Sequence, residues 1–277
     1  MDEREVVARR YGEHLTDQDL LALTGGRPDQ IPALRREPTL ILDLLDRPAV
    51  ADALLTANRD DPERFTYISP FLVFAAAVHR TARSIVGSSY VSERTGPRSR
   101  VPVFDAPQLA AFATVPAHQL YLAELLASYS RLSSGVMWRR TGRGWRRQRW
   151  DELDLPRLAA LLEAVPPLQR PAVWRRLGDG AMFLAGVFPD HAERSLGPLE
   201  VSRLVQATGL RLRSTEVLGG NVVGLLEELA SQAYGQAGRA VPEEAARRPG
   251  SVRRLLTLIS DRYLFPFAAD WLPRPAI

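Results

Sequence analysis

The sequence predicts an all-α protein, a compact multi-helix bundle with one or two small β-hairpin excursions. Most of the chain consists of short segments with helical apolar periodicity that begin at capping residues or prolines. The stretch 171–189 is apolar on nearly all sides, which is typical of a helix buried inside a protein. Its small residues Gly178, Ala181 and Ala185 share one face, where a second helix can approach closely. We expect this stretch to be the central helix.

The other helices are expected from their start and stop signals. Thr16 with Asp19 predicts a capped helix that ends at Gly25. Ser69 followed by Pro70 starts a helix that is apolar all round in its first half, so we expect it to pack against the central helix. Further helices are expected over 3–14, from Pro38 and Pro48, after Asp105, from Pro116, and over 155–165, 199–208, 221–238 and 251–263.

Two stretches interrupt the helical pattern. Residues 88–105 carry a Thr-Gly-Pro turn between two short β-prone runs, and residues 135–150 carry the turn sequence 141–144 between strands rich in Trp and Val. No repeat or linker is apparent, so we expect one helical domain over 1–277, within which 1–60 could form an N-terminal helical subdomain.

Composition excludes several chemistries. The 277-residue chain is 45% hydrophobic and carries a formal net charge of +4. It has no cysteine, which excludes disulfides and zinc–thiolate sites, and no lysine, which excludes a lysine Schiff base and a Walker-type lysine. The charged N-terminus lacks a signal-peptide pattern and no apolar run reaches a membrane span, so we expect a cytoplasmic protein with no membrane contact.

Three stretches, RLGDGAMFLAGVFPD at 176–190, YLAELLASYSR at 121–131 and SDRYLFPFAADWLP at 260–273, carry a resemblance. Together they resemble an uncharacterised family of helical bacterial proteins, of actinobacterial type, with no established activity. The likeness covers hydrophobic and small-residue pattern from about Ser69 onward and includes no catalytic motif. It implies a helical fold and nothing about mechanism.

The sharpest functional pattern is the segment from Trp138 to Trp150. With a turn at Gly142 and Arg143, Arg140 stands opposite Trp145 and Trp138 stands opposite Arg147. Such pairs are worth about 0.5–2 kcal/mol and could simply hold the hairpin together. Alternatively, the arginine guanidinium groups bind phosphates and the tryptophans stack on bases. A third interpretation is that the positive charges bind an acidic protein surface. The candidate nucleic-acid-binding residues are Arg139, Arg140, Arg143, Trp145, Arg146, Arg147 and Arg149.

Other candidates are weaker. Asp179 in the central helix is either ion-paired, for example to Arg83, or an acid or base with a shifted pKa, and His79 is either a core histidine or a ligand. Around Asp179 and His79 an inter-helix pocket could serve an enzyme or small-molecule sensor. A helix-turn-helix over 203–218 is a further interpretation. Histidines lack metal-ligand spacing and no phosphate loop is present, so no metal or cofactor is expected.

The sequence therefore predicts a non-enzymatic regulatory or interaction protein whose Arg/Trp hairpin meets an anionic partner, with nucleic acid favoured. The alternatives are the enzyme or sensor with a pocket at Asp179 and His79, and a structural assembly component.

Overall fold

The computed structural model describes residues 2–60, 68–94, 100–130, 134–141, 144–211, 221–238 and 241–264; for 57–60, 94, 134–141 and 144–150 it describes the backbone. The chain divides into two compact units, where one helical domain was expected. Unit 1 comprises Met1–Ser130 and Thr257–Leu272, and unit 2 comprises Arg131–Leu256 and Pro273–Ile277. The expected N-terminal subdomain 1–60 belongs to unit 1, together with the helices that follow it.

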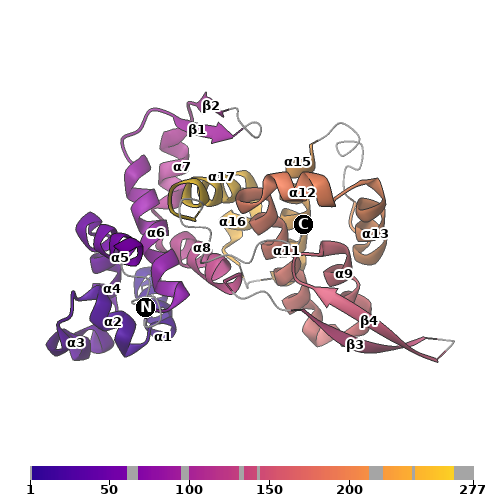
Figure 1. Cartoon of the computed structure of the whole chain (residues 1–277), viewed down its shortest axis with the longest axis horizontal. Helices are drawn as coiled ribbons and strands as arrows, with labels where there is room; N and C mark the ends of the chain where they lie inside the picture. The colour runs from indigo at the N-terminus through magenta and orange to yellow at the C-terminus, as the bar shows by residue number, and fades with distance from the viewer. Residues whose placement is uncertain are drawn as a thin grey trace. The chain divides into compact units, whose positions relative to one another are not determined.

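The predicted all-α fold with small hairpins is confirmed (Figure 1). The helical elements of unit 1 are α1 (Glu3–His14), α2 (Asp17–Leu23), η1 (Pro28–Gln30), α3 (Ile31–Arg36), α4 (Thr39–Leu45), α5 (Pro48–Asp60), α6 (Pro70–Ile85), α7 (Ala106–Ala113), α8 (Pro116–Ser128) and the π-helical turn η5 (Ser260–Leu264). Those of unit 2 are α9 (Leu155–Ala159), α10 (Leu161–Ala164), η3 (Pro167–Gln169), α11 (Arg170–Val187), α12 (Pro189–Ser195), α13 (Pro198–Thr208), α15 (Val222–Ala237) and α16 (Glu243–Arg247). Helix α17 (Pro249–Ile259) starts in unit 2 and passes into unit 1 at Thr257.

Both expected hairpins are present as separate two-stranded antiparallel sheets. Strands β1 (Val91–Arg94) and β2 (Arg100–Val103) form the first sheet, in unit 1. Strands β3 (Ser134–Thr141) and β4 (Gly144–Asp151) form the second, in unit 2.

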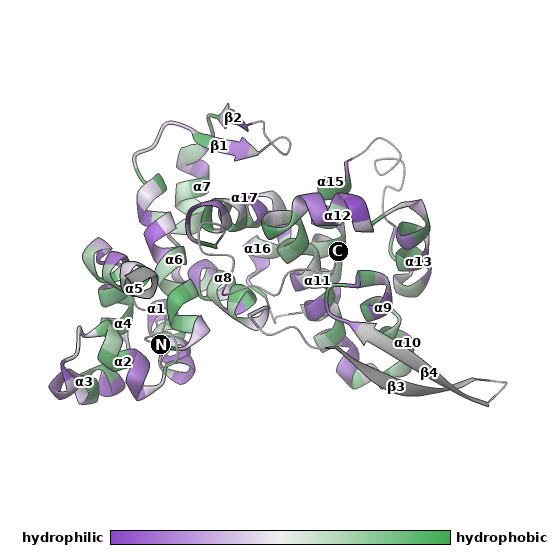
Figure 2. Ribbon diagram, viewed as in Figure 1, coloured by the Kyte–Doolittle hydropathy of each residue, from purple (hydrophilic) through white to green (hydrophobic). Residues whose placement is uncertain are grey.

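Helix α6 is the core helix of unit 1. Ser69 caps it by accepting a 3.3 Å hydrogen bond from the Leu72 N–H, and Pro70 occupies its first position, as the sequence predicted. All residues from 71 to 79 are buried, and Figure 2 shows this half of the helix as apolar and the following turns as more hydrophilic. The helix packs against α5 and α8, so its apolar circumference is covered within unit 1.

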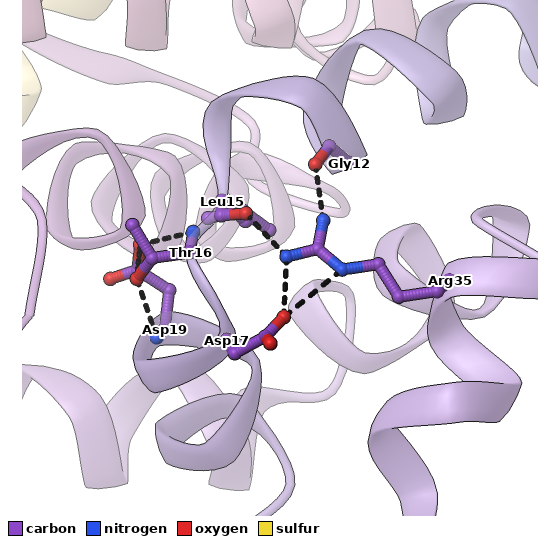
Figure 3. Close-up of polar contacts among 6 residues, drawn as sticks. All are labelled: Gly12, Leu15, Thr16, Asp17, Asp19 and Arg35. Atoms are coloured by element: carbon purple, nitrogen blue, oxygen red, sulfur yellow. Dashed lines mark hydrogen bonds and ion pairs between the residues drawn. The ribbon is translucent and has the colours of Figure 1, made fainter.

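The first helices of unit 1 are held by local polar contacts (Figure 3). Thr16 and Asp19 form the predicted capping box, with the Asp19 carboxylate accepting from both the N–H and the hydroxyl of Thr16 at 2.8 Å. Arg35 of α3 donates to the carbonyls of Gly12 and Leu15 at 2.7 and 2.9 Å, at the end of α1. A guanidinium at a helix C-terminus donates to the free carbonyls there, and its positive charge is attracted to the negative end of the helix dipole.

Asp19 also links this region to α6. Its other carboxylate oxygen accepts a 2.7 Å hydrogen bond from the backbone N–H of Ser69, and the residue is fully buried. A buried carboxylate is tolerated because these donors replace its hydration. The start of α6 is therefore positioned by a residue fifty positions earlier in the chain.

Helix α11 is the central helix of unit 2, and its principal partner is α15 rather than the Pro70 helix that we expected. Residues 177–187 are all buried. A Cβ added at Gly178 would lie 2.4 Å from the Tyr234 ring, so the two helices approach closely at the small-residue face that the sequence indicated. Ala181 and Ala185 on the same face are also buried.

Candidate functional site

The Arg/Trp hairpin, formed by β3 and β4, has the register that the sequence predicted. Trp138 pairs with Arg147, and Arg140 pairs with Trp145. The predicted turn at Gly142 and Arg143 lies outside the described residues. Figure 1 shows the two strands as a ribbon that extends beyond the helices of unit 2.

The register sorts the basic residues of the hairpin into two sets. Because side-chain positions alternate along a strand, pairs two positions apart share a face and adjacent pairs do not. The two Arg–Trp pairs are two positions apart, and Val136 paired with Arg149 follows on the same face. The pair between them, Arg139 and Arg146, belongs to the opposite face. Two arginines at directly opposed positions are unfavourable to each other, which makes an anion between them favourable.

The base of the hairpin is anchored to the helices of unit 2. Asp151, the last residue of β4, accepts a 2.9 Å hydrogen bond from the N–H of Leu153. Asp154 then caps α9 by accepting from the N–H of Arg157 at 3.1 Å. Glu152 forms a 2.7 Å ion pair with Arg176 of α11, and both side chains are largely buried, at 13% and 20% exposure. These acidic residues fix the strand ends to the helical body, and the sequence analysis did not single them out.

His79 lies in a buried polar chain within unit 1. Its Nε2 is 3.1 Å from the Tyr11 hydroxyl and its Nδ1 is 2.9 Å from Oδ1 of Asp46, whose Oδ2 pairs with Arg83 at 3.0 Å. His79 and Tyr11 are 1% and 0% exposed. Arg83 is thus the partner of Asp46, whereas the sequence had offered it as a partner for Asp179.

The pKa values of this chain of side chains follow from burial and neighbouring charges. Burial acts to raise the pKa of Asp46, but the hydrogen bonds and positive charges of His79 and Arg83 outweigh it, so that pKa is lowered. Burial, with the nearby charges of Asp46 and Glu124, raises the pKa of Tyr11 well above its ordinary value. Tyr11 is therefore held neutral. The arrangement links α1, α4 and α6 and leaves neither ring in contact with solvent.

Asp179 lies in unit 2 with partners of its own. It accepts a 3.0 Å hydrogen bond from the hydroxyl of Tyr234 on α15, and its other oxygen is 3.6 Å from Nε of Arg175, one turn earlier on α11. The carboxylate is therefore an anchor of the α11–α15 contact. Asp179 and His79 belong to different units, and each has its hydrogen-bond partners within its own unit.

The helix-turn-helix interpretation of 203–218 is only partly covered by the structure. Helix α13 ends at Gly209, which adopts the left-handed conformation with φ of 67°. The residues that would contact a groove, Ser214 and Thr215, lie outside the described residues. No helix in the described ranges is long and apolar enough to span a bilayer. Over the same ranges, no three His, Asp or Glu side chains are grouped as ligands for a metal ion.

Comparisons of the chain with protein-family models, with curated proteins and with solved structures find no match. The resemblance to a bacterial helical family stays a prediction, and function has to be argued from geometry and charge.

Proposed function

We propose that this chain is a non-enzymatic binding protein that contacts nucleic acid through the Arg/Trp hairpin. The observation that carries the proposal is the register of β3 and β4. It pairs Trp138 with Arg147 and Arg140 with Trp145 on one face, and Arg139 with Arg146 on the other. The first face can stabilise the hairpin by cation–π contacts, and the second presents paired positive charge.

The chemistry of these residues favours phosphate. Arginine binds phosphate oxygens in a bidentate way, which a lysine ammonium does not. Six arginines fall within residues 138–150 and no acidic residue does. Tryptophan adds a surface for stacking unpaired bases. An acidic protein surface would satisfy the charges but gives no role to the interspersed tryptophans beyond holding the hairpin.

The anchoring of the hairpin supports a binding role. The ion pair of Glu152 with Arg176 and the cap at Asp154 hold the strand ends against α9 and α11. A hairpin whose base is held in this way loses less conformational freedom on binding than an unanchored segment would. Preorganisation of this kind reduces the entropy lost on association.

The test is a triple substitution of Arg139, Arg143 and Arg146 to glutamine. Three charges are removed without touching the Arg–Trp pairs, and the helical content should be unchanged by circular dichroism. Binding of labelled single-stranded and duplex probes is measured by fluorescence anisotropy over a salt series. Each lost phosphate contact reduces the slope of log K against log salt by about 0.7 on single strands or about 0.9 on duplex. The variant should therefore lose about 2 to 3 units of slope.

The matched control replaces three exposed arginines of unit 2, Arg203, Arg247 and Arg248, with glutamine. These residues pair with Glu200, Glu243 and Glu244, and such surface pairs contribute little to stability. The control changes the net charge by the same amount and should retain most of the affinity. Equal losses in both variants would assign binding to overall charge. Absence of salt-sensitive binding by the wild type at low ionic strength would refute the proposal.

A further inference from the structure

A pocket in unit 1 combines groups suited to a small organic anion. It lies where the end of α6, the β1–β2 hairpin and the turn η5 meet, and its volume is about 390 Å³. That equals the liquid volume of about a dozen waters, at the lower end of ligand-pocket sizes. Neither His79 nor Asp179 lines it, so it is a different place from the pocket that the sequence suggested.

The charged groups of the pocket leave one positive charge in excess. Arg100 of β2 pairs with Asp261 of η5 at 2.7 Å. Arg262, the next residue, donates from Nη1 to Oγ of Ser84 at 2.8 Å. Within the part of the chain that the structure describes, Arg262 makes no ion pair. Two guanidinium groups beside one carboxylate favour a ligand with a single negative charge.

One residue that lines the pocket carries a hydroxyl group without a hydrogen-bond partner. Thr81 lines it, is 2% exposed, and its Oγ1 is buried without a partner. An unsatisfied buried hydroxyl is costly, and such groups in native structures call for an explanation. The neighbouring Ser84 hydroxyl is already engaged, since it donates to the Thr81 carbonyl at 2.8 Å and accepts from Arg262. A ligand acceptor beside Arg262 would give Thr81 its missing partner after a rotation about χ1.

The remaining lining is apolar and includes an exposed aromatic pair. Ile85, Val91 and Leu258 contribute aliphatic surface. Tyr90 lines the pocket and lies 6.0 Å from Phe104, measured between ring centroids; these side chains are 53% and 75% exposed. Exposed aromatic rings beside a concave surface are typical of ligand sites. The π-helical turn that carries Arg262 is of a kind found frequently at functional sites.

We propose that this pocket binds a small aromatic carboxylate. The carboxylate group is held by the Arg262 guanidinium and the Thr81 hydroxyl. The ring lies against Ile85, Val91 and Tyr90. One excess positive charge matches a single carboxylate better than the several charges of a nucleotide's phosphates, and the site shares no lining residue with the Arg/Trp hairpin.

The test is a titration of the full chain with 4-fluorobenzoate, followed by ¹⁹F NMR. We expect saturable binding that unlabelled benzoate displaces. Arg262→Gln removes a charged hydrogen bond and should weaken binding about tenfold or more. Thr81→Val is nearly isosteric and should weaken binding several-fold. It should leave stability unchanged or higher, because the hydroxyl has no partner to lose. Arg36→Gln, at an exposed arginine of α3, is the matched charge control and should bind as the wild type does.

Each alternative has its own outcome. No saturable binding by wild-type protein at millimolar probe overturns the proposal. Equal weakening by Arg36→Gln assigns the effect to net charge and overturns it as well. If inorganic phosphate displaces the probe as effectively as benzoate does, the site binds anions in general, and the proposal of an aromatic carboxylate is overturned. If neutral fluorobenzene binds as tightly as 4-fluorobenzoate, the pocket is an apolar cavity in which Arg262 does not contact the ligand, and the proposal is overturned.

Discussion

Substituting Gly178 with alanine tests the closest helix contact in unit 2. The added Cβ would lie 2.4 Å from Cε1 and 2.7 Å from Cδ1 of Tyr234, whereas ordinary van der Waals contact begins at 3.4 Å. The ring would have to move by about 1 Å. It has little room to do so, because Tyr234 is 1% exposed and its hydroxyl is hydrogen-bonded to Asp179.

The magnitude follows from three opposing effects. Overpacking a tight contact costs about 1–3 kcal/mol. Disturbing a hydrogen bond to a carboxylate costs up to about 3 kcal/mol more. Replacing glycine with alanine inside a helix gains about 1 kcal/mol. We therefore expect Gly178→Ala to destabilise the protein by up to about 5 kcal/mol, although the same exchange normally stabilises a helix.

Gly235 supplies a matched control within α15, the partner helix. It is exposed, and a Cβ there would meet no atom within 4 Å. Gly235→Ala should therefore show the helix-propensity gain alone, up to about 1 kcal/mol. Urea denaturation followed by far-UV circular dichroism measures both variants, and the transition that shifts identifies unit 2 if the units unfold separately. Equal stability of the two variants would mean that α11 and α15 do not pack tightly at this position.

Two further predictions concern other contacts. Gly186→Ala should also destabilise unit 2, because its Cβ would lie 2.5 Å from Cβ of Leu256; a midpoint equal to the wild type would contradict that approach. The contacts with His79 and Arg83 lower the pKa of Asp46 against the effect of burial. The ionised Asp46 therefore stabilises the fold at pH values above its unfolded-state pKa of about 3.9. This stabilisation is lost as the pH falls through the folded-state pKa. Asp46→Asn should therefore lower the urea midpoint at neutral pH and reduce its decline below about pH 4; an unchanged pH dependence would exclude this contribution.

Local patterns predicted the elements well. The serine and proline at positions 69 and 70 marked the start of α6, and Thr16 with Asp19 marked the capping box of α2. The register of β3 and β4 followed from a turn at Gly142 and Arg143. These features depend on residues a few positions apart, and their geometry is set by backbone sterics and short-range hydrogen bonds. The small-residue face at Gly178 likewise indicated a close helix contact correctly.

Partners distant in sequence could not be predicted in the same way. The face at Gly178 accepts any well-shaped helix, and its choice of α15 depends on the Tyr234 ring and its hydrogen bond to Asp179. Arg83 could equally have paired with several carboxylates; packing of α6 against the end of α4 selected Asp46. Neither the small-residue face nor the position of Arg83 in the sequence indicates which distant side chain will contact it.

The sequence by itself determined the helical class, the hairpins, the excluded lysine and cysteine chemistry, and the concentration of arginine and tryptophan at 138–150, because composition and local periodicity carry that information. Only the tertiary structure decided that His79 contacts Tyr11 and Asp46 and that Asp179 accepts from Tyr234. It alone assembled the pocket of Thr81, Arg100 and Arg262, whose members are separated by up to 181 positions in the chain. A pocket is formed by the packing of distant segments, and packing depends on shape complementarity that no local pattern specifies.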